Sequence, residues 1–343
     1  MLTEDFDYEL PKNLIAQEPL SERDQSRMMV INRLSGKITH TQFRELPQYL
    51  SKGDVLVLNN TKVIPAKAWG KKNETEVEFL FLRERKKGLW EVLCRPARKA
   101  KVGDKFLFAP GFEGKIVASE PEGKRLIQFI SSNILQKLKK IGFAPLPLYI
   151  KRKKDDTLLR ELDLERYQTV FAQQEGAIAA PTAGLHFTPR ILEKIKKKGV
   201  IVTHISLDVG QATFRPVREK RIENHTMLDE KYSISLFTSQ ILNTNKEESR
   251  PVVAVGSTVV RALESAFKNG KVHAGSRSTR LFIYPGYEFK VVDCLLTNFH
   301  LPKSTLLMMA AAFSSLELIK KAYKEAIREK YRFYSYGDCM LIL

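Results

Sequence analysis

The sequence has few cysteines and no long apolar run. Its three cysteines, Cys94, Cys294 and Cys339, form no CxxC pair and have no histidine at a spacing suited to zinc, which argues against a disulfide framework or a metal site. The longest wholly apolar run, Leu306 to Phe313, is well short of the roughly 18 residues that suggest a membrane span. The first eleven residues carry acidic groups and no apolar segment, so we expect no secretory signal. These absences predict a cytoplasmic protein without a membrane partner.

Positive charge is in large excess and is concentrated in one region. The 343 residues include 57 Lys and Arg against 39 Asp and Glu, a formal net charge of +18. Residues 67–154 hold 22 basic and nine acidic side chains and so carry 13 of these charges. Such a field attracts a polyanion such as RNA, but charge runs are also ordinary solvated surface, and charge alone does not separate the two. The candidate RNA-binding residues are Arg85, Lys86, Lys87, Arg95, Arg98, Lys99, Lys101, Lys151, Arg152, Lys153 and Lys154.

Two patterns of short segments divide the chain. After Lys67, runs such as GLWEVLC, KFLF, GKIVAS and RLIQFI are separated by Gly, Pro and charge, a pattern typical of a small antiparallel barrel or sandwich. Elsewhere strands and helices alternate, as where Thr188 and Pro189 begin a helix before a strand at 200–207. We therefore expect an α/β body with an all-β insertion near residues 67–150. Further strands are predicted at 55–58, 251–255, 281–284 and 289–296, and helices at 132–141, 303–313 and 316–330.

Two segments place a histidine between an expected strand and an expected helix. AAPTAGLHFTP, residues 179–189, contains His186; nearby helix N–H groups disfavour a protonated imidazole, so His186 should be neutral and able to act as a base. LTNFHLPKST, residues 296–305, contains His300. Because α/β ligands bind beyond the carboxyl ends of strands, we expect both corners to face one cleft. A structural role for His186, and a core role for Phe299, are the alternatives.

A third corner, VGSTVVRALES at residues 255–265, follows a buried strand. Its Ser257 and Thr258 hydroxyls and helix amides are suited to a carboxylate or phosphate, whereas Arg261 and Glu264, one helical turn apart, are also placed to pair with each other. The chain has no GxGxxG, GxSxG or HExxH motif, which disfavours several standard enzyme classes. The residues alone thus predict a polar, histidine-bearing cleft beside a basic inserted domain.

Long segments in one order carry a resemblance to a known family. They include LIAQEPLSERDQSRMMV from Leu14, GDVLVLNNTKVIPA from Gly53, AAPTAGLHFT from Ala179, VGSTVVRALES, FIYPGYEFKVVDCLLTNFHLPKSTLL and YRFYSYGDCMLI. Together they resemble the S-adenosylmethionine:tRNA ribosyltransferase-isomerases of queuosine biosynthesis, the QueA family. The resemblance implies a monomeric cytosolic enzyme with a mixed α/β barrel-like main domain, residues 1–66 and 151–343, and an inserted β-barrel domain, residues 67–150.

The resemblance also implies a reaction. The ribosyl part of S-adenosylmethionine is transferred to 7-aminomethyl-7-deazaguanine at the tRNA wobble position, giving epoxyqueuosine and releasing adenine and methionine, with S-adenosylmethionine as substrate and no cofactor. This chemistry needs a base, for which His186 and His300 are the candidates, aromatic faces for a sulfonium and a hold on a carboxylate. The candidate residues for binding S-adenosylmethionine or the modified base are Asn59, Asn60, Thr182, Gly184, Phe187, Thr213, Phe214, Ser257, Thr258, Arg261, Tyr284, Asn298, Phe299, Lys303 and Ser304.

The sequence departs from the family pattern at a few positions. Asp208 and Leu228 stand where histidines are usual, Gln211 and Ala212 replace an Ala-Gly pair, and Leu148 replaces a proline. Two other function classes fit the same composition: a non-catalytic RNA-binding protein, and an S-adenosylmethionine-dependent RNA methyltransferase. The small-molecule products distinguish all three.

Overall fold

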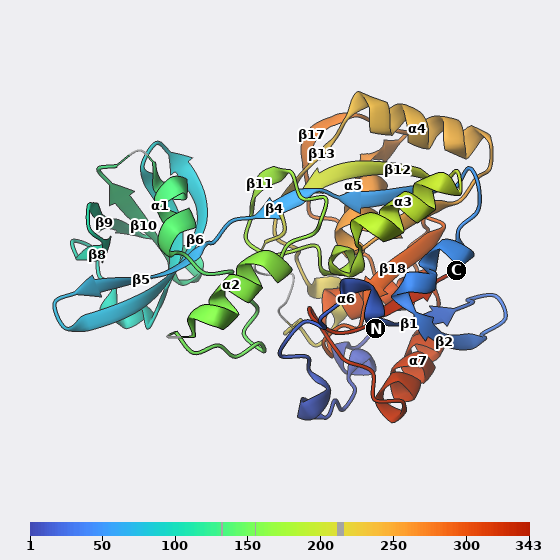
Figure 1. Ribbon diagram of the computed structural model, residues 1–343, viewed down its shortest axis with the longest axis horizontal. Coiled ribbons are helices and arrows are strands. Elements are labelled where there is room, and N and C mark those ends of the chain that lie inside the picture. Colours follow the sequence, from blue (N-terminus) through green and yellow to red (C-terminus); the bar gives the residue numbers. More distant parts are fainter. Residues whose placement is uncertain (132, 155, 211–215) are drawn as a thin grey trace.

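A computed structural model describes residues 1–131, 133–154, 156–210 and 216–343. Figure 1 shows a small β-barrel beside a larger α/β part that holds both termini. Strand β4 (Thr61–Val63) runs toward the barrel and pairs in parallel with β11 (Gln174–Ala177). Helix α2 (Thr157–Arg166) lies between the two parts in this view. Within the described residues, no helix is both long and apolar enough to cross a membrane.

The smaller sheet is a closed antiparallel barrel. Its core takes alternate residues of the strands, such as Val77, Phe79 and Phe81, and helix α1 (Ile134–Ile141) adds Ile134 and Leu138. The mixed α/β fold with an inserted β-barrel is therefore confirmed, although the helix predicted from residue 132 is described only from Ile134. In barrel order the strands are β10 (Lys124–Phe129), β7 (Leu89–Arg95), β6 (Thr75–Lys86), β5 (Lys67–Lys72), β8 (Lys105–Ala109) and β9 (Phe112–Ser119).

The larger sheet has nine strands and two edges. Strands β12, β3, β14 and β18 are parallel neighbours at its centre, and β19 runs antiparallel to β18 and parallel to β1. Two short strands, β15 (Phe267–Lys268) and β16 (Lys271–Val272), form a separate hairpin. In sheet order the nine are β17 (Gly275–Thr279), β13 (Glu230–Ile234), β12 (Ile201–Leu207), β3 (Val55–Asn59), β14 (Val252–Val255), β18 (Cys294–Asn298), β19 (Cys339–Ile342), β1 (Arg27–Ile31) and β2 (Ile38–Gln42).

Helices cover both faces of this sheet, which gives a three-layer body. Alternate strand residues point to opposite faces, so Leu56 and Leu296 pack with α3 (Pro189–Lys197) and the 3-10 helix η4 (Phe43–Tyr49). Val57 and Leu295 pack on the other side. The helices there are α4 (Leu236–Glu247), α5 (Ser257–Ala266), α6 (Thr305–Phe313) and α7 (Leu316–Arg328).

Two predicted strands differ from the structure. Residues 281–284 form no strand, and the strand predicted at 289–296 begins only at Cys294. Side chains satisfy the backbone there: the Leu281 carbonyl accepts from Arg261 Nε at 2.9 Å, and the Glu264 carboxylate accepts the N–H groups of residues 290–292. With these groups already paired, a sheet ladder is not needed.

Candidate active site

The carboxyl ends of the four parallel strands meet along one edge of the nine-stranded sheet. They are Leu207 of β12, Asn59 of β3, Val255 of β14 and Asn298 of β18. Strands β19 and β1 start at this same edge, since β19 runs antiparallel to β18. The corners after β14 and β18 therefore lie at one edge. The segment at residues 179–189 follows β11, which belongs to a separate two-stranded sheet, and reaches this edge through the contact of His186 with Asn298.

His186 is buried and fully hydrogen-bonded. It ends the 3-10 helix η7 (Thr182–His186) and is 3% exposed. Its Nδ1 lies 2.8 Å from Ser26 Oγ and its Nε2 lies 3.0 Å from Asn298 Oδ1. Asn298 donates its amide to the Tyr334 carbonyl, so its Oδ1 accepts and Nε2 carries the proton. Nδ1 is then an acceptor for the one proton of the Ser26 hydroxyl, which also faces the Arg23 carbonyl at 3.1 Å. Burial lowers the pKa of His186 to about 4. The ring is neutral, as predicted, but burial is the main cause.

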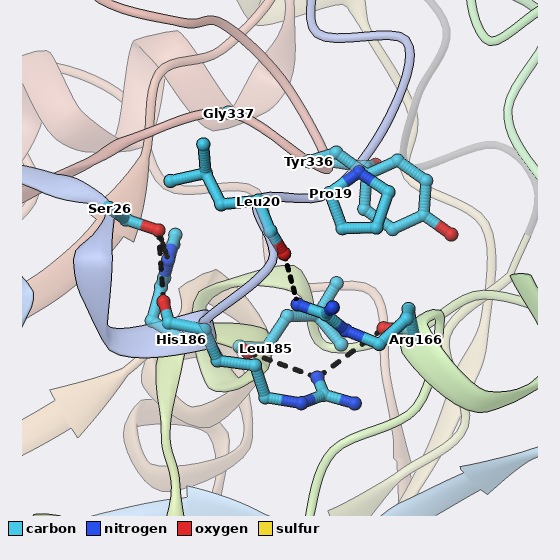
Figure 2. A pocket seen from close by; sticks show the side chains of 10 residues that line it. Pro19, Leu20, Ser26, Arg166, Leu185, His186, Tyr336 and Gly337 are labelled. Carbon is cyan, nitrogen blue, oxygen red and sulfur yellow. Dashed lines mark hydrogen bonds between the residues drawn. The ribbon is translucent and has the colours of Figure 1, made fainter. Parts of the chain in front are cut away.

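A small cavity of about 20 Å³ lies beside His186. Figure 2 shows Ser26 and His186 on one side of it and Arg166 on the other, with Leu20, Pro19 and Tyr336 nearby. The cavity has room for a group about the size of one oxygen atom of a larger ligand, and none for a nucleoside.

His300 has a different environment. It follows β18, is 7% exposed, and its Nε2 lies 2.9 Å from Thr297 Oγ1. Its backbone is fixed by two tyrosines: His300 N–H donates to Tyr323 Oη, and the Tyr8 hydroxyl donates to the His300 carbonyl. Nδ1 has no hydrogen-bond partner among the described residues. Burial lowers the pKa of His300 to about 3, so this ring is neutral too, and only its Nε2 takes part in a hydrogen bond within the described residues.

The expectation that the two histidines share one cleft is wrong. Side chains alternate along β18, so Thr297 and Asn298 point to opposite faces of the sheet, and each binds one histidine. His300 lines a second cavity of about 20 Å³ together with Thr182, Ser257 and Thr258. The structure thus gathers three of the predicted residues around His300, in a cavity that His186 does not line.

A much larger cleft opens between the barrel and the sheet edge. Its volume is about 520 Å³, which is the size of a site for a drug-sized ligand. Val209 lines both this cleft and the His300 cavity. Asp208 and Leu228, two of the departures from the family pattern, also line it, and sequence reasoning did not assign them to the site. Their departure from the family pattern was the signal in the sequence that could have assigned these two residues to the site. The barrel contributes Leu82, Arg83, Glu91, Leu93, Glu122 and Lys124.

Buried ion pairs organise the charges around this cleft. Arg261 pairs with Glu230, which also accepts the Gly210 N–H at 3.0 Å. Arg261 is 2% exposed, and its Nη2 has no hydrogen-bond partner among the described residues. It does not pair with Glu264, which accepts backbone N–H groups and the Tyr287 hydroxyl instead. On the barrel side, burial acts to raise the pKa of Glu91, but Arg83, Arg85 and Lys124 hold it below its usual value.

Two of the predicted aromatic faces, Phe187 and Phe299, are core residues. Phe187 packs edge-on against Phe43 and Phe299 against Tyr323, and both phenylalanines are fully buried. Neither offers a ring face to a sulfonium, because each fills one side of the sheet. Tyr284 is partly buried against Phe282. Thr213 and Phe214 lie outside the described residues, as do Gln211 and Ala212.

Several other predicted residues have structural contacts at or near the carboxyl edge of the nine-stranded sheet. Asn59 Nδ2 donates to the Leu207 carbonyl and to Thr258 Oγ1, and Asn60 accepts from the Ser206 hydroxyl. Gly184 is buried in η7 with no room for a side chain beside Phe171. Ser304 caps α6 through the Leu307 N–H, and Lys303 pairs with Glu4 and Asp7, so neither lies beside the candidate cavities.

The predicted RNA-binding residues form separate groups. Lys86 and Lys87 lie at the tip of the β6–β7 hairpin. Arg95 ends β7 and the other candidates at residues 98–101 follow it, roughly 20 Å away at 3.3 Å per strand residue. Residues 151–154 precede α2. All are exposed except Arg152, whose guanidinium is bound to buried Asp163 at 2.6 Å. Arg152 is therefore a structural residue.

No group of three or more His, Cys, Asp or Glu side chains suited to a metal occurs in residues 1–131, 133–154, 156–210 and 216–343. The candidate site is therefore described by its histidines, carboxylates, hydroxyls and backbone amides.

Comparison with known proteins identifies the family. A family profile described as "Queuosine biosynthesis protein" matches residues 3–342. S-adenosylmethionine:tRNA ribosyltransferase-isomerases from Desulfitobacterium hafniense and Halothermothrix orenii are 47% and 48% identical over the full length of both chains. The crystal structure of S-adenosylmethionine tRNA ribosyltransferase from Thermotoga maritima is similar with a TM-score of 0.57 and 38% identity, and the match covers 99% of this chain and 100% of that one. The chain belongs to the queuosine biosynthesis family.

Proposed function

We propose that this protein is an S-adenosylmethionine:tRNA ribosyltransferase-isomerase. It transfers and isomerises the ribosyl group of S-adenosylmethionine onto 7-aminomethyl-7-deazaguanine at the tRNA wobble position and releases adenine and methionine. The observation that carries the proposal is the 520 Å³ cleft, which lies between a barrel rich in basic residues and the His300 corner of the sheet. Relatives carrying this enzyme name match over their entire length.

The cleft suits a cationic small substrate. Asp208 lies on its wall and is exposed, with Thr61 Oγ1 3.3 Å from its carboxylate. A carboxylate there attracts either the sulfonium of S-adenosylmethionine or the aminomethyl group of the base. In the adjoining cavity, Ser257 and Thr258 at the start of α5 present hydroxyls and helix amides for the methionine carboxylate.

His300 is the better placed of the two candidate bases. Its free Nδ1 accepts a proton from the carbon beside the sulfonium, and the electron pair stays on that carbon. The aminomethyl nitrogen bonds to the ribosyl carbon that carries adenine, and adenine leaves with the C–N electron pair and takes up the proton that the nitrogen loses. The nitrogen lone pair then expels the ring oxygen, and the carbanion bonds to the resulting iminium carbon, which returns the C=N electron pair to nitrogen. The freed ring oxygen bonds to the carbon beside sulfur, and methionine leaves with the C–S electron pair as the epoxide closes. His186, with both ring nitrogens bonded, acts by positioning Ser26 and Asn298.

The exposed cations of the barrel and of the segment before α2 bind the tRNA backbone in this proposal. Changing Lys86 and Lys87 together to Gln should weaken tRNA binding and reduce its dependence on salt, by about 0.7 in the log–log slope for each phosphate that the variant no longer neutralises. The measurement is the tRNA dissociation constant over a range of salt concentrations. An unchanged slope would remove this hairpin from the binding surface.

The decisive test is an incubation with S-adenosylmethionine and tRNA that carries the aminomethyl precursor, followed by mass analysis of nucleosides and small products. Adenine, methionine and epoxyqueuosine support the proposal. S-adenosylhomocysteine identifies a methyltransferase, and tRNA retention without any product identifies an RNA-binding protein.

We also propose that residues 67–150 act as an inserted domain in a main domain of residues 1–66 and 151–343, and that the protein works as a cytoplasmic monomer. The barrel strands and α1 all fall within the inserted range. Limited proteolysis tests the domain boundaries, and light scattering of the purified chain tests the monomer. A dimer mass would contradict it.

A further inference from the structure

Three arginines gather at the small cavity beside His186, and none of their guanidinium groups is in contact with a carboxylate of the described residues. Arg23 and Arg166 line it, and Arg332 is near enough to lower the pKa of His186 together with Arg23. None of the three arginines forms an ion pair with a carboxylate of the described residues. Burial, with Arg166 contributing, lowers the pKa of Arg23, so the arginines repel one another across the site.

Backbone carbonyls hold these arginines in place. Arg166 donates to the Leu20 carbonyl at 2.7 Å, as Figure 2 shows, and to the Ser21 carbonyl at 3.0 Å. Arg23 donates to the Leu185 carbonyl at 3.1 Å. Hydrogen bonds to carbonyls fix the planar guanidinium groups but neutralise no charge. Arg166 Nε is buried and has no hydrogen-bond partner, a donor that an arriving acceptor would satisfy.

The buried carboxylates nearby are already occupied. Asp24 accepts from Arg190 at 3.0 Å, Asp163 accepts from Arg152 and from the Tyr336 hydroxyl, and Asp338 accepts the N–H groups of residues 27 and 332. Neutral His186 adds no counter-charge. Glu165, Glu18 and Asp338 act on Arg23 and Arg332 only through space, so this half-buried cationic site still lacks an anion in contact with its guanidinium groups.

We infer that Arg23 and Arg166 form a binding site for one phosphodiester group of the bound RNA. The inference rests on the proposed function, because it assumes that the protein binds tRNA. The cavity volume of about 20 Å³ admits an oxygen of one oxyanion while the remainder of the ligand stays outside. Helix α2, which ends at Arg166, follows directly on the exposed lysines at 151, 153 and 154, so a phosphate chain held by these lysines leads along α2 to the cavity.

The test compares tRNA binding by the native chain and by Arg166→Gln over a range of salt concentrations. The variant should bind about tenfold more weakly at low salt, and its log–log slope should fall by about 0.7. Arg328→Gln is the matched control, since Arg328 is 70% exposed on α7 and pairs with Glu325; it removes the same charge elsewhere and should leave the slope unchanged.

Two further measurements keep the outcomes distinct. Arg166→Lys keeps the charge but removes the two-pronged donor, so it should bind more weakly with the native slope, and it decides the matter if Arg166→Gln fails to fold. The dissociation constant for S-adenosylmethionine should be unchanged in both variants. An unchanged salt slope for tRNA binding in Arg166→Gln would overturn the inference. Weakened binding of S-adenosylmethionine alone would also overturn it, because the cavity would then bind the carboxylate of that substrate. Failure of the native chain to bind tRNA would instead overturn the proposed function.

Discussion

The His186 and His300 corners share a local design but differ in what their imidazoles can do. In both, a buried, neutral histidine lies just before a helix at the carboxyl edge of the same sheet. His186 has partners on both ring nitrogens, whereas His300 is bonded only through Nε2 and lies next to the large cleft. Their positions in the sequence therefore make the two histidines equal candidates for the base. Their hydrogen bonds distinguish them, because only His300 has a ring nitrogen without a partner among the described residues.

The largest expected effect is the loss of turnover when His300 is replaced. Replacing His300 with Ala should lower turnover by about 10²- to 10⁴-fold, the usual contribution of a general base. Binding of tRNA and of S-adenosylmethionine should be retained, and His273→Ala, at an exposed histidine, is the control. Single-turnover release of adenine is the measurement. Activity within tenfold of the native rate would place the base elsewhere.

Replacing His186 with Ala should act on stability. The change leaves Asn298 Oδ1 without this partner in a buried site, which costs about 1–3 kcal/mol, whereas the Ser26 hydroxyl keeps the Arg23 carbonyl at 3.1 Å. Urea denaturation measures the loss of stability, and turnover per folded molecule should fall far less than in the His300 variant. Abolished turnover in a fully stable His186 variant would reverse the comparison and make His186 the base.

Acid should destabilise both corners. The folded pKa values of His186 and His300, about 4 and about 3, lie below the unfolded value near 6.5. Between the folded and unfolded pKa values the unfolded chain therefore binds more protons than the folded chain. The contribution of each neutral histidine to the free energy of unfolding is fully present above about pH 6.5, and it falls by up to about 1.4 kcal/mol for each pH unit below that. The midpoint of urea unfolding from about pH 7 to pH 5 measures this. His186→Ala should show a shallower dependence, and an identical slope would contradict the assignment.

The smallest expected effect is on the pH dependence of the rate. Because the pKa of His300 is about 3, the base stays unprotonated throughout the neutral range, and kcat should change less than about twofold from pH 8 to pH 6 through this group. A pH profile of single-turnover rates tests it. A fall in the single-turnover rate with a midpoint near pH 6.5 would indicate that an exposed histidine, and not His300, is the base.

Local sequence signals predicted much of the fold. The alternation of Val77, Phe79 and Phe81 indicated the barrel, and Thr188 with Pro189 marked the start of α3, where the Thr188 hydroxyl accepts the Ile191 N–H at 3.2 Å. Both depend on neighbours in the chain. The strand predicted at residues 281–284 failed because Arg261, twenty residues away, takes the Leu281 carbonyl, and no local pattern indicates such an interaction.

The candidate site was less accessible to sequence reasoning. The corners after β14 and β18 were correctly placed at one edge, because parallel strands end together, whereas the His186 segment follows β11 outside this sheet. Which face of the sheet each histidine occupies depends on the register of β18, and the burial of Phe187 and Phe299 depends on packing from distant helices. The roles of these residues remain predictions, as does the assignment of the exposed lysines to tRNA.

The position of β19 bears on how the polypeptide matures. This strand, at residues 339–342, lies between β18 and β1 and joins the first strands to the rest of the sheet. The barrel closes from residues that are all synthesised before residue 130, whereas the larger sheet cannot be completed until β19 has been translated and has left the ribosome. Until then the edge of β1 that pairs with β19 has no partner strand. A chain truncated before β19 would keep this edge exposed and would therefore be prone to aggregate.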